Sequence, residues 1–188
     1  MVEAIAPPHE KLITGDELYE MVGVGPCELI DGRIVPMSPT GNEHGGVELT
    51  IAETIKGFVR QKKLGKVRSG EVGIYTHRDP DRVRAADVLY ISDERYARRT
   101  KSRGYLDVAP DLVVEVLSPG DAVMDLTQKL REYFAIGVRL VWVADPEARL
   151  VYAYRSLTDI REFKETDILV GDDVLPGFEA PVATLFED

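Results

Sequence analysis

Two carboxylates, Asp87 and Glu115, occupy apolar stretches of the sequence where an ionised group is costly. Glu115 interrupts the run from Leu112 to Leu117, which is mostly β-branched, lies between two prolines and is typical of a strand buried on both faces. Asp87 falls, by the period of two, in the apolar row of a second predicted strand over residues 82–91. A buried carboxylate costs several kcal/mol unless a cation or hydrogen-bond donors compensate it, so the chain must supply partners for both acids. The other members of that row are Val83, Ala85, Leu89 and Ile91.

A divalent cation shared by Asp87 and Glu115 would remove this cost. Oxygen ligands favour Mg²⁺ or Mn²⁺ over zinc, because the neighbouring sequence offers neither cysteine nor paired histidines. Glu71, in a predicted strand over 66–77, and Glu48, in a predicted helix over 42–63, are further candidate metal ligands and could hold a second ion. Such ions can polarise a phosphodiester and activate water, so the predicted chemistry is metal-assisted phosphodiester hydrolysis.

Lys129 is the third candidate catalytic residue. A helix is predicted to about Ile136, and its period of 3.6 places Lys129 beside Tyr133 on the flank of the core-facing stripe. The ammonium could lie over the end of the strand that contains Glu115, where it would orient or help to deprotonate the attacking water and offset charge in the transition state. Alternatively, Lys129 forms an ordinary surface pair with Asp125 at i, i+4. The spacing fits both arrangements.

His44 is an accessory candidate at the N-terminal end of the predicted helix over 42–63. The apolar stripe of this helix, extended backwards by steps of three and four, passes through Glu48 and then His44. Both ionisable groups would then face a cleft. The alternative is that this helix end is exposed and both side chains are solvated. The sequence does not separate the two arrangements.

The remaining elements are predicted as a scaffold around these groups. Thr14 to Glu17 has the form of a capping box and predicts a short helix, and Asp31-Gly32 joins two strands in a hairpin. The segment from Ser118 to Asp121 predicts a turn that leads into the helix containing Lys129. Residues 1–10 are predicted to be a poorly ordered lead-in to one domain that spans 1–188. Other predicted segments are the strands over 27–30, 33–37, 139–144 and 150–155 and a closing segment over 170–186 that packs back on the core.

The net charge of −10 over 188 residues argues against non-specific coating of nucleic acid, because phosphate binding depends on lysine and arginine. The cations are nevertheless segregated into two basic clusters. One explanation of this segregation is that both clusters lie on ordinary solvated faces of the protein. The other is that they form a surface that faces phosphate groups, which makes the second cluster a candidate nucleic-acid contact. That second cluster comprises Arg95, Arg98, Arg99, Lys101 and Arg103, and the first comprises Lys56, Arg60, Lys62, Lys63, Lys66 and Arg68.

The single cysteine, Cys27, excludes an intramolecular disulfide and a cysteine cluster for zinc or iron–sulfur, which fits a reducing compartment. No apolar run approaches the roughly 20 residues that span a bilayer, and no signal sequence opens the chain. We therefore expect a cytoplasmic protein without a membrane partner.

The motifs also follow one another in a recognisable order. Asp87 is followed by Pro110-Asp-Leu-Val-Val-Glu115-Val-Leu-Ser-Pro119, then by Lys129-Leu-x-x-Tyr133-x-x-x-Gly137-Val138, and then by Val141-Trp-Val-x-Asp145-Pro146. This order resembles the Uma-type family of putative restriction endonucleases, which belongs to the PD-(D/E)XK nuclease superfamily. Gly171-Asp172 and Pro176-Gly-Phe178 resemble the family's closing segment, so the likeness extends over most of the chain.

The resemblance implies an α/β fold with a restriction-endonuclease-like core, in which helices flank a central mixed β-sheet, here with an N-terminal helix and β-hairpin. It also implies Mg²⁺-dependent cleavage of DNA, with RNA as an alternative substrate. Asp87 and Glu115 match the metal-binding acids, and Lys129 matches a lysine that this family places on the helix. Two departures are Leu117, at the superfamily's usual lysine position, and Ala86, where a proline would precede the aspartate.

Two functions of different classes remain open. As an enzyme, the protein would be a metal-dependent endonuclease. As a binding module, it would keep the nuclease fold without the chemistry and would act on nucleic acid or a protein partner through its surface. The presence of Asp87, Glu115 and Lys129 favours the enzyme. A homodimer is expected because a double-strand cut needs two active sites, and light scattering would detect it.

Overall fold

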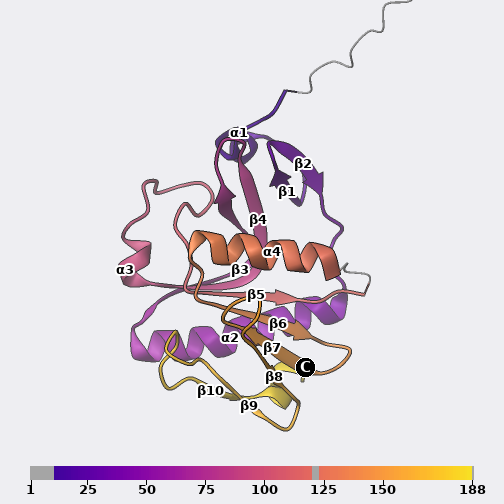
Figure 1. Cartoon of the computed structure of the whole chain (residues 1–188), viewed down its shortest axis with the longest axis vertical. Coiled ribbons are helices and arrows are strands. Elements are labelled where there is room, and N and C mark those ends of the chain that lie inside the picture. Colours follow the sequence, from indigo (N-terminus) through magenta and orange to yellow (C-terminus); the bar gives the residue numbers. More distant parts are fainter. Residues whose placement is uncertain (1–10, 120–122, 188) are drawn as a thin grey trace, which may run out of the picture.

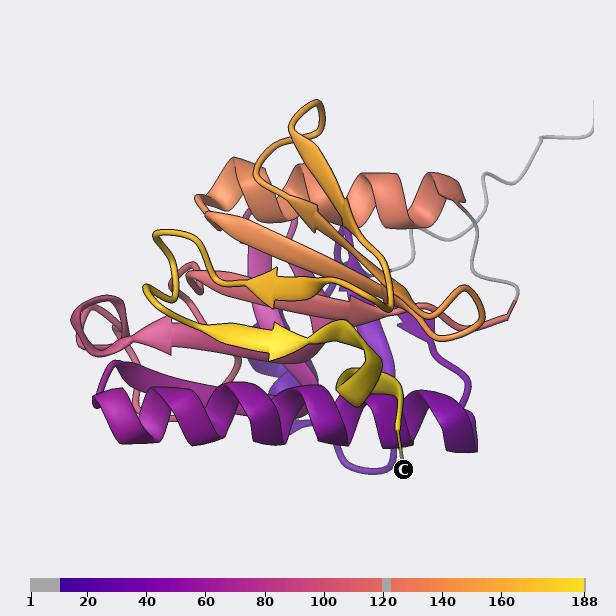
Figure 2. The ribbon, with the colours of Figure 1, turned by 90° about the horizontal axis from the view of Figure 1, so that it is seen from below.

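An eight-stranded sheet carries both buried acids, Asp87 and Glu115, and a long helix packs against each of its faces (Figures 1 and 2). The computed structural model describes residues 11–119 and 123–187, so the predicted lead-in over 1–10 and Asp121 of the predicted turn lie outside the described residues. Helix α2 (Asn42–Lys62) covers one face and α4 (Val123–Ile136) covers the other. No helix in the described part of the chain combines the length and apolar character needed to cross a membrane.

The sheet is mixed but mostly antiparallel. Its strand order is β2-β1-β4-β5-β6-β7-β8, with β3 paired to β4, and within it only β5 and β6 run parallel. A parallel pair needs a crossover connection, which α4 supplies. This arrangement confirms the predicted α/β fold with a central mixed sheet flanked by helices. The strands are β1 (Cys27–Ile30), β2 (Arg33–Pro36), β3 (Gly65–His77), β4 (Arg82–Ser92), β5 (Leu112–Val116), β6 (Leu140–Asp145), β7 (Leu150–Tyr154) and β8 (Ile160–Phe163).

The predicted helices and strands are present, with most boundaries shifted by no more than one residue. Helix α1 (Gly15–Glu20) begins at a capping box in which Thr14 and Glu17 exchange hydrogen bonds, as predicted. Three short strands near the C-terminus were not predicted, because three or four residues carry too little periodicity to be recognised. The equally short β1 and β2 were predicted because Asp31-Gly32 between them is a hairpin signal. The elements that the sequence analysis did not predict are β8, β9 (Ile168–Val170), β10 (Glu179–Pro181) and the 3₁₀ helix η1 (Val182–Phe186). A short helix, α3 (Asp93–Tyr96), follows β4.

The sheet separates two apolar clusters. One cluster lies between the sheet and α2, where buried side chains of the helix pack with the closing segment and Trp142 of β6. Leu175 and Phe178 are buried in it, which confirms that the closing segment packs back on the core. The other cluster lies between the sheet and α4, and it includes Leu130 and Tyr133 of that helix. Both faces of the central strands are therefore buried, as expected for near-continuous apolar runs.

The alternation of faces along β4 breaks at Asp87. Leu89 and Ile91 belong to the cluster on the α4 face, and so does Ala86, although a regular strand would place Ala86 on the opposite face from Leu89. Val88 belongs to the cluster on the α2 face. The single apolar row predicted through Asp87 is therefore interrupted at that residue.

A β-bulge on the neighbouring strand explains the interruption. The register of β3 on β4 shifts at this point, so that Gly70 and Glu71 together oppose the single residue Asp87. Both bulge residues have positive φ, 87° for Gly70 and 54° for Glu71. On the other side, the pairing of β4 with β5 ends at Val88. Asp87 thus lies where regular pairing stops on both sides.

An ionic network ties β1, β4 and α4 together. Arg84 donates to Glu28 Oε2 at 2.8 Å and to the two carboxylate oxygens of Glu132 at 2.7 and 2.9 Å. Glu132 also accepts hydrogen bonds from Arg82 and Thr76. Burial raises the pKa of Glu132, but the hydrogen bonds from Arg84 and its other donors outweigh burial and set that pKa at about 2.

We predict that Glu132→Gln lowers the free energy of unfolding by about 3 kcal/mol at pH 7, because Arg84 would stay buried with less charge compensation. A carboxyl whose folded pKa is depressed stabilises the folded state above its unfolded pKa, which is 4.5 for glutamate, and loses this effect as the pH falls towards about 2. The difference between wild type and variant should therefore shrink over that range. Urea unfolding at a series of pH values measures it, with the exposed Glu53→Gln as control. A difference that is independent of pH would contradict the assignment.

Candidate active site

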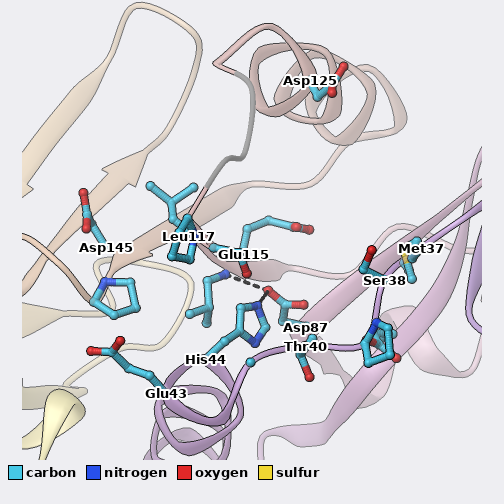
Figure 3. A pocket seen from close by; sticks show the side chains of 18 of the residues that line it. Met37, Ser38, Thr40, Glu43, His44, Asp87, Glu115, Leu117, Asp125 and Asp145 are labelled. Carbon is cyan, nitrogen blue, oxygen red and sulfur yellow. Dashed lines mark hydrogen bonds and ion pairs between the residues drawn. The ribbon is translucent and has the colours of Figure 1, made fainter.

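A cavity of about 1020 Å³ opens at the C-terminal end of β5 and contains the predicted catalytic residues (Figure 3). Its walls come from the segment between β2 and α2, the first turn of α2, the middle of β4, and the turn between β6 and β7. Asp87, Glu115 and Lys129 all line it, and so do His44 and Glu71. Residues from five separate parts of the sequence therefore meet in one place.

The Glu115 carboxylate is buried in the cavity wall and held by two donors from α4. Lys129 Nζ donates to Oε2 at 2.9 Å, and the Tyr133 hydroxyl donates to Oε1 at 2.7 Å. Glu115 is 5% exposed and Tyr133 is fully buried. Burial raises the pKa of Glu115 to about 7, against the opposing charge of Lys129. The structure thus supplies the partners that the sequence required of this residue.

Lys129 lies between two carboxylates. Its Nζ is 2.9 Å from Glu115 and 3.4 Å from Glu28 Oε1, and it also donates to the Ala85 carbonyl at 3.4 Å. Burial lowers the pKa of Lys129, but the charges of the two carboxylates outweigh burial and raise that pKa above its usual value. Of the two arrangements that the spacing allowed, the structure has the ammonium over the end of β5 and not in a pair with Asp125.

Asp87 reaches across the gap where β4 and β5 separate. Its Oδ2 accepts a hydrogen bond from the Val116 backbone N–H at 2.6 Å and lies 3.4 Å from His44 Nε2. Figure 3 shows the carboxylate between the imidazole ring of His44 and the end of β5. No donor within residues 11–119 and 123–187 hydrogen-bonds to Oδ1, and the residue lines the cavity. Asp87 therefore has one oxygen fixed by the protein and one available to a ligand.

His44 is buried at the start of α2 and lines the cavity, so of the two arrangements that the sequence allowed for it, the structure has the one that faces a cleft. Its hydrogen bond to Asp87 raises the pKa of the imidazole against the opposing effect of burial. The Nδ1 atom is buried and has no hydrogen-bond partner in the described part of the chain. Tied to Asp87 through Nε2, the ring can place a positive charge beside this carboxylate.

Glu48 supports the bulge and does not line the cavity. Its Oε1 accepts the Gly70 backbone N–H at 2.8 Å, an N–H that the bulge releases from the strand ladder. Burial raises the pKa of Glu48, and this hydrogen bond opposes the rise. Glu71, the other bulge residue, does line the cavity. The structure therefore separates the two further candidate metal ligands: Glu71 lines the cavity, and Glu48 hydrogen-bonds to the bulge beside it.

The cavity is strongly acidic. Eight carboxylate residues of the described chain line it, against one ammonium, Lys129, and one imidazole, His44. Such a surface repels a phosphate group unless cations are present. The eight are Glu28, Glu43, Glu71, Asp87, Glu115, Asp125, Asp145 and Glu147.

The donor set fits a magnesium ion that keeps several waters. Asp87 offers its free oxygen, and each oxygen of Glu115 has accepted only one hydrogen bond and retains a lone pair. Mg²⁺ is commonly bound through one or two carboxylates together with water and substrate phosphate. Among the described residues, no group of three or more histidine, cysteine, aspartate or glutamate side chains could hold a metal ion, which argues against an all-protein site of the zinc type.

Glu28 is a site residue that the sequence analysis assigned to the scaffold. It is buried, lines the cavity, accepts the Ala85 backbone N–H at 3.0 Å and approaches Lys129. A strand of four residues is too short for its period to show which face is buried, so no sequence pattern indicated this role. Tyr133 was named only as the neighbour of Lys129 on the predicted helix, and its hydroxyl proves to be a partner of Glu115.

The basic cluster over 95–103 does not line this cavity. Arg95 donates to the carbonyls of Ala109, Pro110 and Gly137, which makes it a structural residue. Arg98 pairs with Glu94. The three remaining members, Arg99, Lys101 and Arg103, line a second pocket.

We predict that Lys129→Met raises the pKa of Glu115 above about 7 in metal-free buffer, because the charge that lowers it is removed. A ¹³C NMR titration of the glutamate carboxyl carbons measures this pKa, with Glu115→Gln to identify the resonance. Lys129→Arg keeps the cation and should give a smaller rise. If the methionine variant leaves the pKa unchanged, Lys129 does not compensate Glu115 in solution.

Comparison with known proteins shows the family and the fold of the chain. The chain matches the model of the Uma2 family, described as a putative restriction endonuclease, over residues 18–183. It is similar to the crystal structure of a putative nuclease belonging to DUF820 from Anabaena variabilis ATCC 29413, with a TM-score of 0.77 and 19% sequence identity, over 93% of this chain and 97% of that chain. At this identity the likeness shows a shared fold. We found no match among curated proteins.

The family match covers most of the chain and includes Asp87, Glu115 and Lys129. It confirms the resemblance inferred from the order of the motifs. The chain belongs to the Uma2 family of putative restriction endonucleases.

Proposed function

We propose that this protein is a Mg²⁺- or Mn²⁺-dependent endonuclease that hydrolyses phosphodiester bonds of DNA. The observation that carries the proposal is the arrangement at the end of β5, where a buried glutamate, an aspartate with a free oxygen and a lysine meet in one cavity. Membership of a family described as putative restriction endonucleases supports the nuclease activity and the choice of DNA. Hydrolysis by this arrangement requires a cation, since the cavity itself is acidic.

Asp87 and Glu115 would hold the metal ion. When bound, Mg²⁺ polarises a phosphoryl oxygen and lowers the pKa of water, which is the chemistry that phosphodiester hydrolysis needs. The protein fixes one oxygen of Asp87 through the Val116 N–H, so the other oxygen is held in a defined position. Tyr133 and Lys129 do the same for Glu115. The residues thus orient both carboxylates before any ligand arrives.

Lys129 acts as a hydrogen-bond donor and not as a base in this proposal. Its raised pKa keeps the ammonium protonated at neutral pH, so it cannot accept the proton of the attacking water. An ammonium on the cavity wall can instead orient that water and stabilise negative charge on the phosphate as it develops. Glu28 and Glu115 hold the ammonium between them, so this donor is placed in advance.

The alternative is a nuclease fold that binds nucleic acid or a protein without cleaving it. A non-catalytic module has less physical reason to keep a buried glutamate, because a well-packed apolar residue is often no less stable there than a buried ion pair. The free oxygen of Asp87 in an acidic cavity likewise suits a cation better than a structural role. The homodimer that a double-strand cut requires stays a prediction.

We predict that isothermal calorimetry detects Mg²⁺ or Mn²⁺ binding to the wild type and that Glu115→Ala abolishes it. The cation should also raise the melting temperature of the wild type, because a ligand that binds only the folded state stabilises it. Glu147→Gln, which removes a charge from a residue elsewhere on the cavity lining, is the matched control and should retain binding. Equal responses of wild type and Glu115→Ala would place the cation elsewhere and contradict the proposed site.

We predict that the wild type nicks or cuts plasmid DNA in Mg²⁺ and that Asp87→Asn and Glu115→Gln reduce the rate by about a thousandfold or more. Both changes keep the side-chain shape and remove the charge that the cation needs. Gel electrophoresis of supercoiled DNA measures the rate, with EDTA and Glu147→Gln as controls. Cleavage by Asp87→Asn at the wild-type rate would refute the assigned site. Nucleic-acid binding that is unaffected by EDTA, without any cleavage in Mg²⁺, would favour the binding module.

A further inference from the structure

A second, basic pocket of about 210 Å³ is lined by residues of β3, β4, α3 and the loop that follows α3. Figure 1 shows where these elements lie in the fold. Its lining includes four cationic residues and, among the described residues, no carboxylate. This composition is the opposite of that of the first cavity and stands out in a chain of net charge −10. The cations are Arg68, Arg99, Lys101 and Arg103.

Three of these four charges lack an acidic partner in the described part of the chain. Arg68 donates only to the Val67 carbonyl. Arg99 donates through Nε to the Tyr96 carbonyl and stacks 3.4 Å from the centre of the Tyr96 ring, which leaves its terminal nitrogens free of hydrogen bonds. Arg103 makes no ion pair or hydrogen bond there. Lys101 pairs with Asp16, which is half exposed. The pocket therefore presents uncompensated positive charge.

The walls of the basic pocket are fixed by packing. Leu106 exchanges backbone hydrogen bonds with β3, accepting from Tyr75 at 3.0 Å and donating to Gly73 at 2.8 Å. Tyr105 lies so close to Gly73 that a Cβ there would be 2.1 Å from the tyrosine ring. The same ring makes an edge contact with Tyr75. The loop is thus pinned to the sheet, and the pocket is formed before a ligand binds.

Part of the lining of the basic pocket is apolar, and this part is its floor because the strand residues Leu89 and Ile91 in it are buried. It is built from four aliphatic side chains of β3, β4 and the loop, beside the ring of Tyr105. Inorganic phosphate would contact the cationic residues but not this apolar floor. A nucleotide can contact both, because its phosphate binds the cationic residues and its base packs on the floor. The aliphatic residues are Val72, Leu89, Ile91 and Leu106.

One strand borders both sites. Arg68 and Val72 of β3 line the basic pocket, and Glu71 between them lines the acidic cavity. Three residues of extended chain span no more than about 11 Å, so the backbone positions of Arg68 and Glu71 are close. A polynucleotide that reaches the cavity can therefore place a neighbouring nucleotide in the basic pocket, where the attraction that the cavity lacks is available.

We infer that the basic pocket binds an unpaired nucleotide of the nucleic-acid substrate, next to the segment that enters the acidic cavity. The arginines take the phosphate, and the apolar floor and Tyr105 take the base, which a duplex would keep stacked and out of reach. The identity of the ligand as part of a substrate rests on the proposed function. Binding at the basic pocket needs no metal ion.

The test is fluorescence anisotropy of a labelled single-stranded oligonucleotide in EDTA, where no cleavage occurs. Arg68→Gln/Arg103→Gln removes two charges that have no acidic partner among the described residues. Arg68 lies 5.9 Å from the centre of the Tyr96 ring, and Arg99, which stacks closer to that ring at 3.4 Å, is left in place. We expect about tenfold weaker binding and a salt dependence whose slope in log–log form is reduced by about one unit. The matched control is Lys56→Gln/Arg131→Gln, which removes the same charge from exposed positions on α2 and α4.

Equal binding by the two double variants would overturn the inference, because the loss would then reflect net charge alone. If a duplex binds the wild type as tightly as the single strand does, and the pocket variant loses the same affinity for both, the nucleotide in the pocket need not be unpaired and that claim is wrong. The proposed function fails separately. If binding depends on the basic pocket but the wild type does not cleave DNA in Mg²⁺, the proposed endonuclease activity is wrong and the inference about the basic pocket stands. If the wild type cleaves DNA and the pocket variant binds the oligonucleotide as tightly as the wild type, the inference is wrong and the proposed activity stands.

Discussion

The burial of Glu115 is the constraint on which the site depends. A carboxylate on the central strand β5 is costly in an apolar surrounding, and two donors from α4 compensate it. Lys129 and Tyr133 lie four residues apart on that helix, so one helix face supplies both. The crossover helix between the parallel strands therefore packs against the sheet and also supplies both hydrogen-bond donors to the Glu115 carboxylate.

The position of Asp87 has a different origin. Regular strand pairing stops on both sides of it, at the bulge of β3 and at the end of the β5 ladder. One oxygen of its carboxylate accepts a hydrogen bond from the Val116 backbone N–H, which orients the carboxylate and leaves the other oxygen available in the cavity. Glu48 satisfies the N–H that the bulge exposes. A local defect in the sheet, supported by its own hydrogen bonds, thus creates the opening in which Glu115 and Asp87 meet.

The sequence was sufficient for features that depend on local periodicity and chain order. Burial of Glu115 followed from the apolar run around it, and the place of Lys129 beside Tyr133 followed from the helical period. Tertiary contacts had to decide whether Lys129 paired with Glu115 or Asp125. The bulge opposite Asp87 leaves no periodic signature, because it is defined by the register of two strands. The role of Glu28 was not predicted either, because its strand has only four residues and too few positions to show which face is buried.

The distribution of charge links the chemistry to recognition. The acidic cavity attracts divalent cations and repels a polyanion, so a nucleic acid can approach it only with cations bound or with a basic anchor nearby. The basic pocket on the other side of Glu71 can provide that anchor, and it is small, preformed and partly apolar. The net charge of −10 disfavours non-specific coating of nucleic acid by the protein as a whole. A protein with this separation of charge can hold one short segment of nucleic acid at a defined place without coating the polymer.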